Sequence, residues 1–232
     1  MTRVKICGLM NPSDVAMAVG AGADALGFVT EYPIPVPWNL DQDVSRHLIA
    51  QAPPFVTTTA VVGGSVANMV AIARHVRPDV LQLHGDETVD EVREVCAALV
   101  PDGIKVIKAL RIDIDTGLAQ FSDPDPVGAA SALATAGIAA LVIDSKTSTR
   151  PAGTGVPLDR DLVLRVAETL AIPFILAGGL NPANVGDAVE QVRPFAVDVI
   201  SGIEERAGVK DACLMNAFVA AVRGAQSGGS AA

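Results

Sequence analysis

The sequence predicts an α/β fold, a single (β/α)8 barrel of the TIM type with parallel strands, and three observations lead to this prediction. The length of 232 residues suits one such barrel. Short β-branched runs alternate with longer helical patterns from one end of the chain to the other. The turn after the first strand reads Cys7-Gly8-Leu9-Met10, which lacks the G-x-G-x-x-G pattern that usually follows the first strand of an open doubly wound sheet.

The strands are expected at short, nearly continuous apolar runs, which are typical of parallel strands buried on both faces. In chain order these runs are residues 3–7, 25–29, 55–62, 80–83, 104–109, 140–144, 173–177 and 195–200. Helices are expected between and after them, at 11–21, 41–51, 65–76, 87–99, 127–136, 159–170, 182–191 and 209–223.

Two of the helix starts carry an N-cap residue followed by proline, at Asn11-Pro12 and at Asn181-Pro182. No composition shift divides the chain. We therefore expect one catalytic barrel domain over residues 1–223 and a disordered tail over 224–232, where small and polar residues dominate.

The charge balance and the cysteines limit the class of protein. Asp and Glu number 26 against 17 Lys and Arg, so the net charge of -9 disfavours a basic face that binds nucleic acid. The 3 cysteines show no C-x-x-C pairing, which favours a reducing compartment over a disulfide scaffold. Without a membrane-spanning run or a secretory signal, we expect a cytoplasmic protein, a monomer or homodimer that binds neither membrane nor nucleic acid.

In a barrel the active site lies where strands end and βα-loops begin. Lys5 and Cys7 share the inward side of the first strand. A lone buried cysteine is often an inert core residue, but the charge of Lys5 would favour a thiolate or hold an anionic group. Asp144 closes an apolar strand, where burying a carboxylate costs free energy unless the group has a role. That role is either functional or structural, as a helix cap or as a salt-bridge partner of Lys146 or Arg150.

The fourth strand ends in His84, which is either an acid–base group or a neutral side chain bonded to backbone. Gln82 points inward on the same strand and is expected to line the site. The histidines are scattered and no paired carboxylate motif occurs, so no metal site is expected.

Glycine-containing turns follow the seventh and eighth strands, the usual place for a phosphate site in a barrel. They are Gly178-Gly179 and Ser201-Gly202. Backbone N–H groups in such turns bind phosphate without a basic side chain, so an acidic protein can hold a phosphosugar. Gly155, in the long loop after the sixth strand, is expected to contribute to the same site.

Together these motifs resemble the phosphoribosylanthranilate isomerases of tryptophan biosynthesis. The similar segments keep the order of that family and read VKICG at 4–8, ALGF at 25–28, LQLHG at 81–85, VIDS at 142–145 with GTG at 153–155, AGGLNP at 177–182 and VDVISGIE at 197–204.

The resemblance implies an aldose–ketose isomerase that acts on a small phosphosugar, N-(5-phosphoribosyl)anthranilate, by an Amadori rearrangement that needs no cofactor. It implies that Asp144 is the general acid that protonates the furanose ring oxygen. Cys7, as thiolate, would then remove the C2 proton. We expect Asp198, with Lys5, Gln82 and His84, to bind the substrate.

The loop after the second strand departs from the family pattern, which usually contains a motif S-x-R-x-V associated with the anthranilate end. Residues 30–40 contain no Arg or Lys, and they hold the only tyrosine, Tyr32, and the only tryptophan, Trp38. Trp38 is expected either to stack on the aryl group or to cover the barrel rim. The carboxylate would need a donor elsewhere, and Arg111 is favoured over Arg46 and Arg150 because it follows a strand.

Two alternatives stay open at this point. One is an isomerase of the same mechanism that acts on another aminoaldose phosphate, because of the altered loop. The other is a phosphosugar-binding barrel without catalytic activity.

Overall fold

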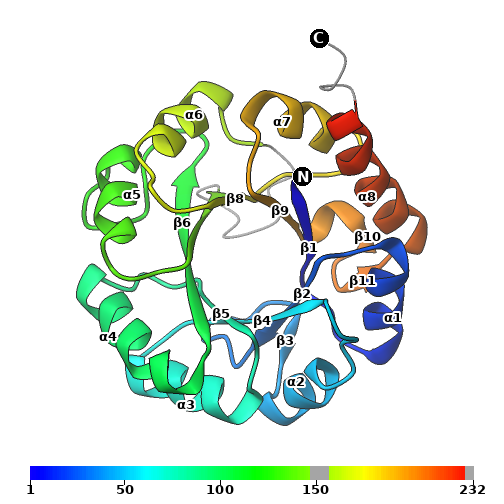
Figure 1. Ribbon diagram of the computed structural model, residues 1–232, viewed down its shortest axis with the longest axis horizontal. Helices are drawn as coiled ribbons and strands as arrows, with labels where there is room; N and C mark the ends of the chain where they lie inside the picture. Colours follow the sequence, from blue (N-terminus) through cyan, green and yellow to red (C-terminus); the bar gives the residue numbers. More distant parts are fainter. Residues whose placement is uncertain (147–156, 228–232) are drawn as a thin grey trace.

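A computed structural model describes residues 1–146 and 157–227, and it confirms the barrel. The main sheet is parallel, in the order β1-β9-β8-β7-β6-β5-β4-β2-β3, and pairing of β1 with β2 closes it into an eight-stranded ring (Figure 1). The strands are β1 Arg3–Ile6, β2 Ala25–Thr30, β3 Asn39–Leu40, β4 Thr57–Val62, β5 Val80–Leu83, β6 Lys105–Asp113, β7 Ala140–Lys146, β8 Phe174–Leu176 and β9 Ala196–Val199.

Helices α1 to α8 surround the ring (Figure 1). They are α1 Pro12–Ala21, α2 Gln42–Ile49, α3 Val66–Val76, α4 Val89–Leu99, α5 Pro126–Ala134, α6 Arg160–Glu168, α7 Val185–Val192 and α8 Ala212–Ser227, with short 3-10 turns η1 Val100–Asp102 and η2 Ser201–Ile203. Among the described residues, no helix is long and apolar enough to cross a membrane.

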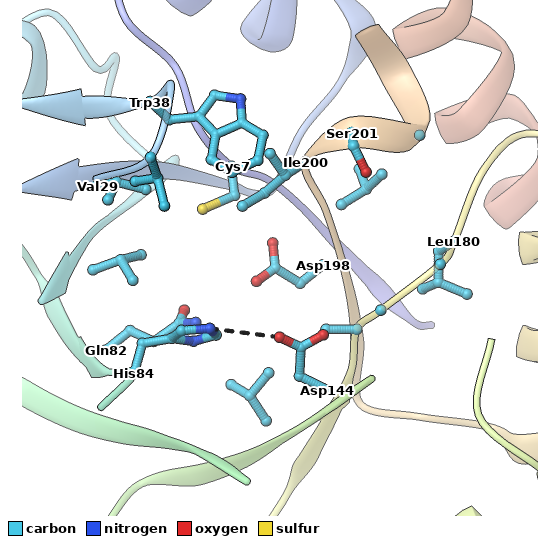
Figure 2. A pocket seen from close by; sticks show the side chains of 18 of the residues that line it. Cys7, Val29, Trp38, Gln82, His84, Asp144, Leu180, Asp198, Ile200 and Ser201 are labelled. Atoms are coloured by element: carbon cyan, nitrogen blue, oxygen red, sulfur yellow. Dashed lines mark ion pairs between the residues drawn. The ribbon is translucent and has the colours of Figure 1, made fainter. Parts of the chain in front are cut away.

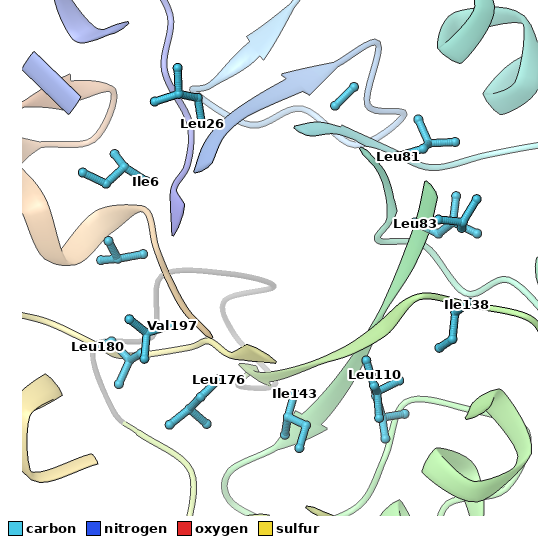
Figure 3. Close-up of a cluster of buried hydrophobic side chains, with 14 of the residues drawn as sticks. Ile6, Leu26, Leu81, Leu83, Leu110, Ile138, Ile143, Leu176, Leu180 and Val197 are labelled. Carbon is cyan, nitrogen blue, oxygen red and sulfur yellow. The ribbon is translucent and has the colours of Figure 1, made fainter. Parts of the chain in front are cut away.

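Alternation along each strand separates the helix-facing core from the barrel interior. Ile6, Leu83 and Ile143 belong to the large cluster that packs against the helices, and Figure 3 shows them around the outside of the strands. Their strand neighbours face inward, where Lys5 is 3% exposed. The predicted inward side of the first strand is therefore confirmed.

One of the two expected helix starts is correct. The Asn11 side chain accepts from the Asp14 N–H at 3.0 Å, and Pro12 opens α1. The other prediction is wrong, since α7 begins at Val185 and Pro182 lies in the turn before it. In that turn the Asn181 N–H donates to the Asn184 side chain at 2.8 Å, so local hydrogen bonding replaces the cap.

The region after β9 differs from the predicted helix over 209–223. A short hairpin, β10 Glu204–Arg206 and β11 Val209–Lys210, precedes α8. Gly208 turns this hairpin with a φ of 80°, a conformation that a helix cannot contain. At its other end α8 continues to Ser227, because Gly224 and Ala225 do not break the helix. This is four residues beyond the expected domain boundary at 223. Residues 228–232 lie outside the described part.

Most of the expected strand bounds differ from the observed ones, and two of the differences have a clear cause or consequence. The third expected strand begins at Thr57 and not at residue 55, because Phe55 has a φ of 72° and a fully exposed side chain. The fifth expected strand runs on to Asp113, so Arg111 lies inside β6 and not in the loop after it.

We expect the protein to be strongly destabilised when one partner is removed from the buried ion pair between Lys108 and Glu87. Lys108 Nζ lies 2.9 Å from Glu87 Oε2 and donates to the Gly85 carbonyl at 2.9 Å. Because Lys108→Met leaves the Glu87 carboxylate buried without its partner, it should lower the free energy of unfolding by about 3–5 kcal/mol in urea denaturation. The same change at Lys105, which is exposed on the same strand, should cost no more than about 0.5 kcal/mol, and equal losses at the two positions would contradict this prediction.

Candidate active site

A cavity opens at the carboxyl ends of the barrel strands, where the sequence predicted the active site. Cys7 follows β1, His84 follows β5, Asp144 lies in β7 and Asp198 in β9, and all four line this cavity (Figure 2). Figure 2 shows Cys7 and Asp144 on two sides of it, with the Asp198 carboxylate between them. The strands β8 and β9 lie between β1 and β7 on one side of the ring, so β7 is next to β6, the strand opposite β1, and the two side chains face each other across the cavity.

An ion pair lies directly beneath the thiol of Cys7. Lys5 Nζ lies 2.6 Å from Asp198 Oδ2, and the two residues are register partners on β1 and β9. Loss of hydration is the largest single effect and lowers the pKa of Lys5, but the charges and hydrogen bonds of Asp198 and Cys7 together hold that pKa above its usual value. Lys5 itself does not line the cavity, so it can act on a ligand only through Asp198 or Cys7.

The Cys7 side chain is almost fully buried. Burial raises the pKa of the Cys7 thiol, the Lys5 ammonium opposes that rise, and Asp198 adds to it. The thiol is therefore the favoured form in the free protein, and the cation beside it is what lowers the cost of forming a thiolate.

The surroundings of Asp144 likewise favour the protonated form of its side chain. Burial and the negative charge of Asp198 raise the pKa of Asp144 to about 7, while Arg111 opposes the rise. Lys146, one of the residues that could have paired with Asp144, is not its partner. The ionisable side chain beside the Asp144 carboxyl is His84, whose Nε2 lies 3.6 Å from Asp144 Oδ2 (Figure 2).

His84 is a neutral imidazole in this setting. Burial, then the charges of Arg111 and Lys108, lower the pKa of His84 to about 3. The imidazole cannot serve as a proton donor near neutral pH, and it faces Asp144 without forming a charged pair. In the part of the chain that the structure describes, His84 Nδ1, Gln82 Oε1 and Asp198 Oδ1 are buried without a hydrogen-bond partner. Unpaired polar atoms are costly to bury, so they mark groups that a ligand can satisfy.

The two glycine turns meet at one side of the cavity, and Gly178, Gly179, Ser201 and Gly202 all line it. A Cβ atom at Gly202 would lie 1.9 Å from the Leu180 carbonyl oxygen, so the β8 and β9 turns touch only because this residue has no side chain. None of the described residues that line the cavity is Lys or Arg. Gly155 lies outside the described residues.

The altered loop after β2 forms the apolar wall of the cavity. Trp38 is 7% exposed and packs with Cys7, Val29 and Val61. It lines the cavity beside Tyr32, whose hydroxyl donates to the His84 carbonyl at 3.0 Å. Both aromatic residues of the loop therefore face the site.

The arginine that the sequence favoured is not at the cavity. Arg111 is buried and paired with Asp86, so its guanidinium already has a carboxylate partner. Its positive charge still acts at the site. It limits the rise that burial causes in the pKa of Asp144, and it adds to the fall that burial causes in the pKa of His84. Arg46 is exposed on α2, and Arg150 lies outside the described residues.

Sequence reasoning missed Lys210, and it quoted Glu204 only as the end of a motif. Glu204 accepts from the Trp38 Nε1–H at 2.7 Å and from Lys210 Nζ at 2.8 Å. Lys210 was placed in an expected helix, so no signal connected it with the strand ends. Within residues 1–146 and 157–227, no group of three or more His, Cys, Asp or Glu could hold a metal ion.

Comparisons with known proteins agree on one family. Residues 4–221 match the family described as N-(5'phosphoribosyl)anthranilate (PRA) isomerase. The chain is 39% identical to N-(5'-phosphoribosyl)anthranilate isomerase of Haloferax volcanii over 227 residues, which is 97% of this chain and 95% of that protein.

Solved structures give the same result. Phosphoribosyl anthranilate isomerase from Thermotoga maritima matches with a TM-score of 0.80 at 30% identity, over 97% of this chain and 100% of that one. A structure of such an enzyme in complex with reduced 1-(o-carboxyphenylamino)-1-deoxyribulose 5-phosphate matches with a TM-score of 0.77 at 29% identity, with the same coverage.

We predict that Asp144 is protonated at about pH 5.5 and loses its proton as the pH rises through about 7, because burial and Asp198 disfavour the carboxylate. Infrared difference spectra between about pH 5.5 and about pH 8.5 should contain the C=O band of a protonated carboxyl that Asp144→Asn removes. Spectra of the two proteins that are identical over this range would show that Asp144 titrates near the usual aspartate value of about 3.9.

Proposed function

The chain belongs to the N-(5'-phosphoribosyl)anthranilate isomerase family, and we propose from the geometry of its cavity how it performs the reaction of that family. The reaction is an Amadori rearrangement in tryptophan biosynthesis. It converts an aminoaldose 5-phosphate, N-(5'-phosphoribosyl)anthranilate, into the aminoketose (o-carboxyphenylamino)-deoxyribulose 5-phosphate, and the enzyme is therefore an aldose–ketose isomerase.

The observation that carries the assignment of roles is the pair of Cys7 and Asp144 across one cavity, with the pKa of each raised by burial and further by the charge of Asp198. An Amadori rearrangement needs a proton donor at the sugar ring oxygen and a base at C2. A carboxyl with a pKa of about 7 and a thiol beside an ammonium group fit these two roles.

In the first step Asp144 is the general acid. Its proton goes to the furanose ring oxygen, the bond between that oxygen and C1 breaks, and the electron pair of the aryl nitrogen forms a protonated Schiff base with C1. Asp144 is left as a carboxylate, which the nearby positive charge of Arg111 stabilises.

In the second step the Cys7 thiolate removes the proton from C2. The electrons of the C–H bond form the C1–C2 double bond, which neutralises the iminium nitrogen and gives an enolamine. In the last step the Cys7 thiol gives its proton to C1 and the Asp144 carboxylate accepts the proton of the C2 hydroxyl, which gives the ketone and restores both groups. Lys5 supports the thiolate electrostatically and is itself held by Asp198.

The buried polar atoms without partners are proposed as the contacts of the open-chain sugar. Asp198 Oδ1 and Gln82 Oε1 are acceptors for hydroxyl groups, and His84 offers its Nδ1 as a neutral group. Trp38 and the apolar side chains beside it are proposed to hold the aryl ring, while Gly178, Gly179, Ser201 and Gly202, with Gly155, hold the phosphate.

Turnover of phosphoribosylanthranilate, followed by the change in fluorescence of the aryl group, tests the assignment. Cys7→Ser and Asp144→Asn should each lower kcat by about 10²–10⁴-fold, because a hydroxyl is a weak base and an amide is no acid. The matched controls are Cys96→Ser and Asp90→Asn on α4, which lie outside the cavity and should keep the parental rate. A folded Cys7→Ser protein with activity within a few-fold of the parent would remove Cys7 from the mechanism.

The phosphate site makes a separate prediction. Gly202→Ala forces the β9 turn away from the Leu180 carbonyl, so binding of inorganic phosphate, measured by calorimetry, should weaken about tenfold or more. Gly20→Ala on α1, where an added Cβ meets nothing within 4 Å, is the control and should bind as the parent does. Unchanged binding by a folded Gly202→Ala protein would place the phosphate elsewhere.

A further inference from the structure

A buried hydrogen-bonded triad joins the altered loop after β2 to the hairpin after β9. The indole Nε1–H of Trp38 donates to Glu204 Oε1 at 2.7 Å, and Lys210 Nζ donates to the same oxygen at 2.8 Å. Lys210 also donates to the Ile200 carbonyl at 3.0 Å. Three segments distant in sequence thus meet at a single carboxylate.

The two charged members of the triad, Glu204 and Lys210, are so deeply buried that either charge without its partner would lower the stability of the fold. The side chains of Glu204 and Lys210 are 3% and 0% exposed. Burial lowers the pKa of Lys210, and the charge of Glu204 opposes that fall. Taking two charges out of water gives little net stability by itself, so the ion pair calls for another role.

The indole ring is the part of the triad that reaches the cavity. Trp38 lines it beside Cys7, and a Cβ atom at Gly8 would come within 3.0 Å of the indole Cδ1. Gly8 also has a φ of 72°, so this turn admits only glycine without strain and lets the ring lie directly over the residue that follows Cys7. The ring is therefore packed against the strand end on one side and hydrogen-bonded at its edge.

The rest of the loop is held independently of the triad. The Tyr32 N–H and carbonyl exchange hydrogen bonds with the Asn39 side chain at 2.8 and 2.9 Å. The Tyr32 hydroxyl binds the His84 carbonyl, and Pro33, Pro35 and Pro37 restrict the backbone between the two ends. The backbone of the loop is thus fixed elsewhere, and the bond to Glu204 acts on the orientation of the indole.

We propose that Glu204, held in place by Lys210, is a positioning residue that fixes the indole of Trp38 as the aryl-binding wall of the cavity and so determines the affinity for the aryl group. The proposal rests on the proposed function, because it assigns the aryl end of that same site. Glu204 acts through Trp38 and touches no reacting atom, so it should affect KM and leave kcat nearly unchanged.

Two double variants separate the hydrogen bond from the ion pair. Glu204→Gln with Lys210→Met, called the Gln/Met protein below, keeps an acceptor for the indole N–H. Glu204→Leu with Lys210→Met, called the Leu/Met protein, removes that acceptor. Both lack the buried charges. The control is Glu205→Leu, at the exposed neighbour of Glu204.

Fluorescence measures the indole without relying on turnover, because Trp38 is the only tryptophan of the chain. The Leu/Met protein should show emission shifted to the red and stronger quenching by acrylamide, since its indole is released towards water. The Gln/Met protein and Glu205→Leu should match the parent. Binding of free anthranilate, followed by quenching of Trp38, should weaken about tenfold in the Leu/Met protein only.

Kinetics on phosphoribosylanthranilate complete the test. The KM of the Leu/Met protein should rise about tenfold with kcat within about threefold of the parent, and Gln/Met should restore the parental KM. Equal fluorescence and equal KM in the two double variants would overturn the positioning role. A fluorescence shift without any change in anthranilate binding or KM would show that the indole is not the aryl wall.

The proposed function and the positioning role of Glu204 can each fail without the other. If the parent protein does not turn over phosphoribosylanthranilate, the proposed function fails, whereas the fluorescence and anthranilate-binding measurements still decide whether Glu204 orients Trp38. If neither double variant folds, Trp38→Phe, which keeps an aromatic face and loses the N–H, should raise KM by the same factor with kcat preserved, and an unchanged KM would overturn the proposal.

Discussion

The buried ion pair between Lys5 and Asp198 is the interaction on which the organisation of the site depends. It joins β1 and β9, the first and last strands of the barrel, which lie side by side, at a distance of 2.6 Å between Lys5 Nζ and Asp198 Oδ2. Leaving either partner alone in the interior would cost about 3–5 kcal/mol. The pair therefore requires a closed barrel, and only in a closed barrel do its charges lie below the catalytic rim.

The two charges of the pair act in opposite directions on each of the proposed catalytic groups. Burial raises the pKa of both Asp144 and Cys7, Asp198 adds to the rise in both, and Lys5 opposes it in both. Asp198 thus favours the proton that Asp144 donates, and Lys5 lowers the cost of the Cys7 thiolate. Arg111 on β6 also limits the rise for Asp144, and its charge adds to the burial that keeps His84 neutral.

The rim of the barrel is built by loops that are held to each other and not only to their own strands. Tyr32 binds the carbonyl of His84, and Trp38 binds Glu204 in the hairpin after β9. Rigid loops keep a ligand pocket preorganised, so less ordering is left for the moment of binding. No described residue that lines the cavity is Lys or Arg, so we propose that backbone N–H groups of the glycine turns after β8 and β9 supply the positive potential for an anionic substrate.

The sequence by itself determined the barrel, the inward side of the first strand and the glycine turns after the last two barrel strands, because apolar runs, strand alternation and glycine turns are local signals. Cys7, Gln82, His84 and Asp144, which these signals placed at or near strand ends, line the cavity. Only the tertiary structure decided which side chains are partners. Arg111 forms an ion pair with Asp86, and Lys210 lies in a hairpin and not in the expected helix. Trp38 is hydrogen-bonded to Glu204, which is 166 residues away in the sequence. Such pairings depend on which loops meet when the ring closes, and no local pattern in the chain encodes that meeting.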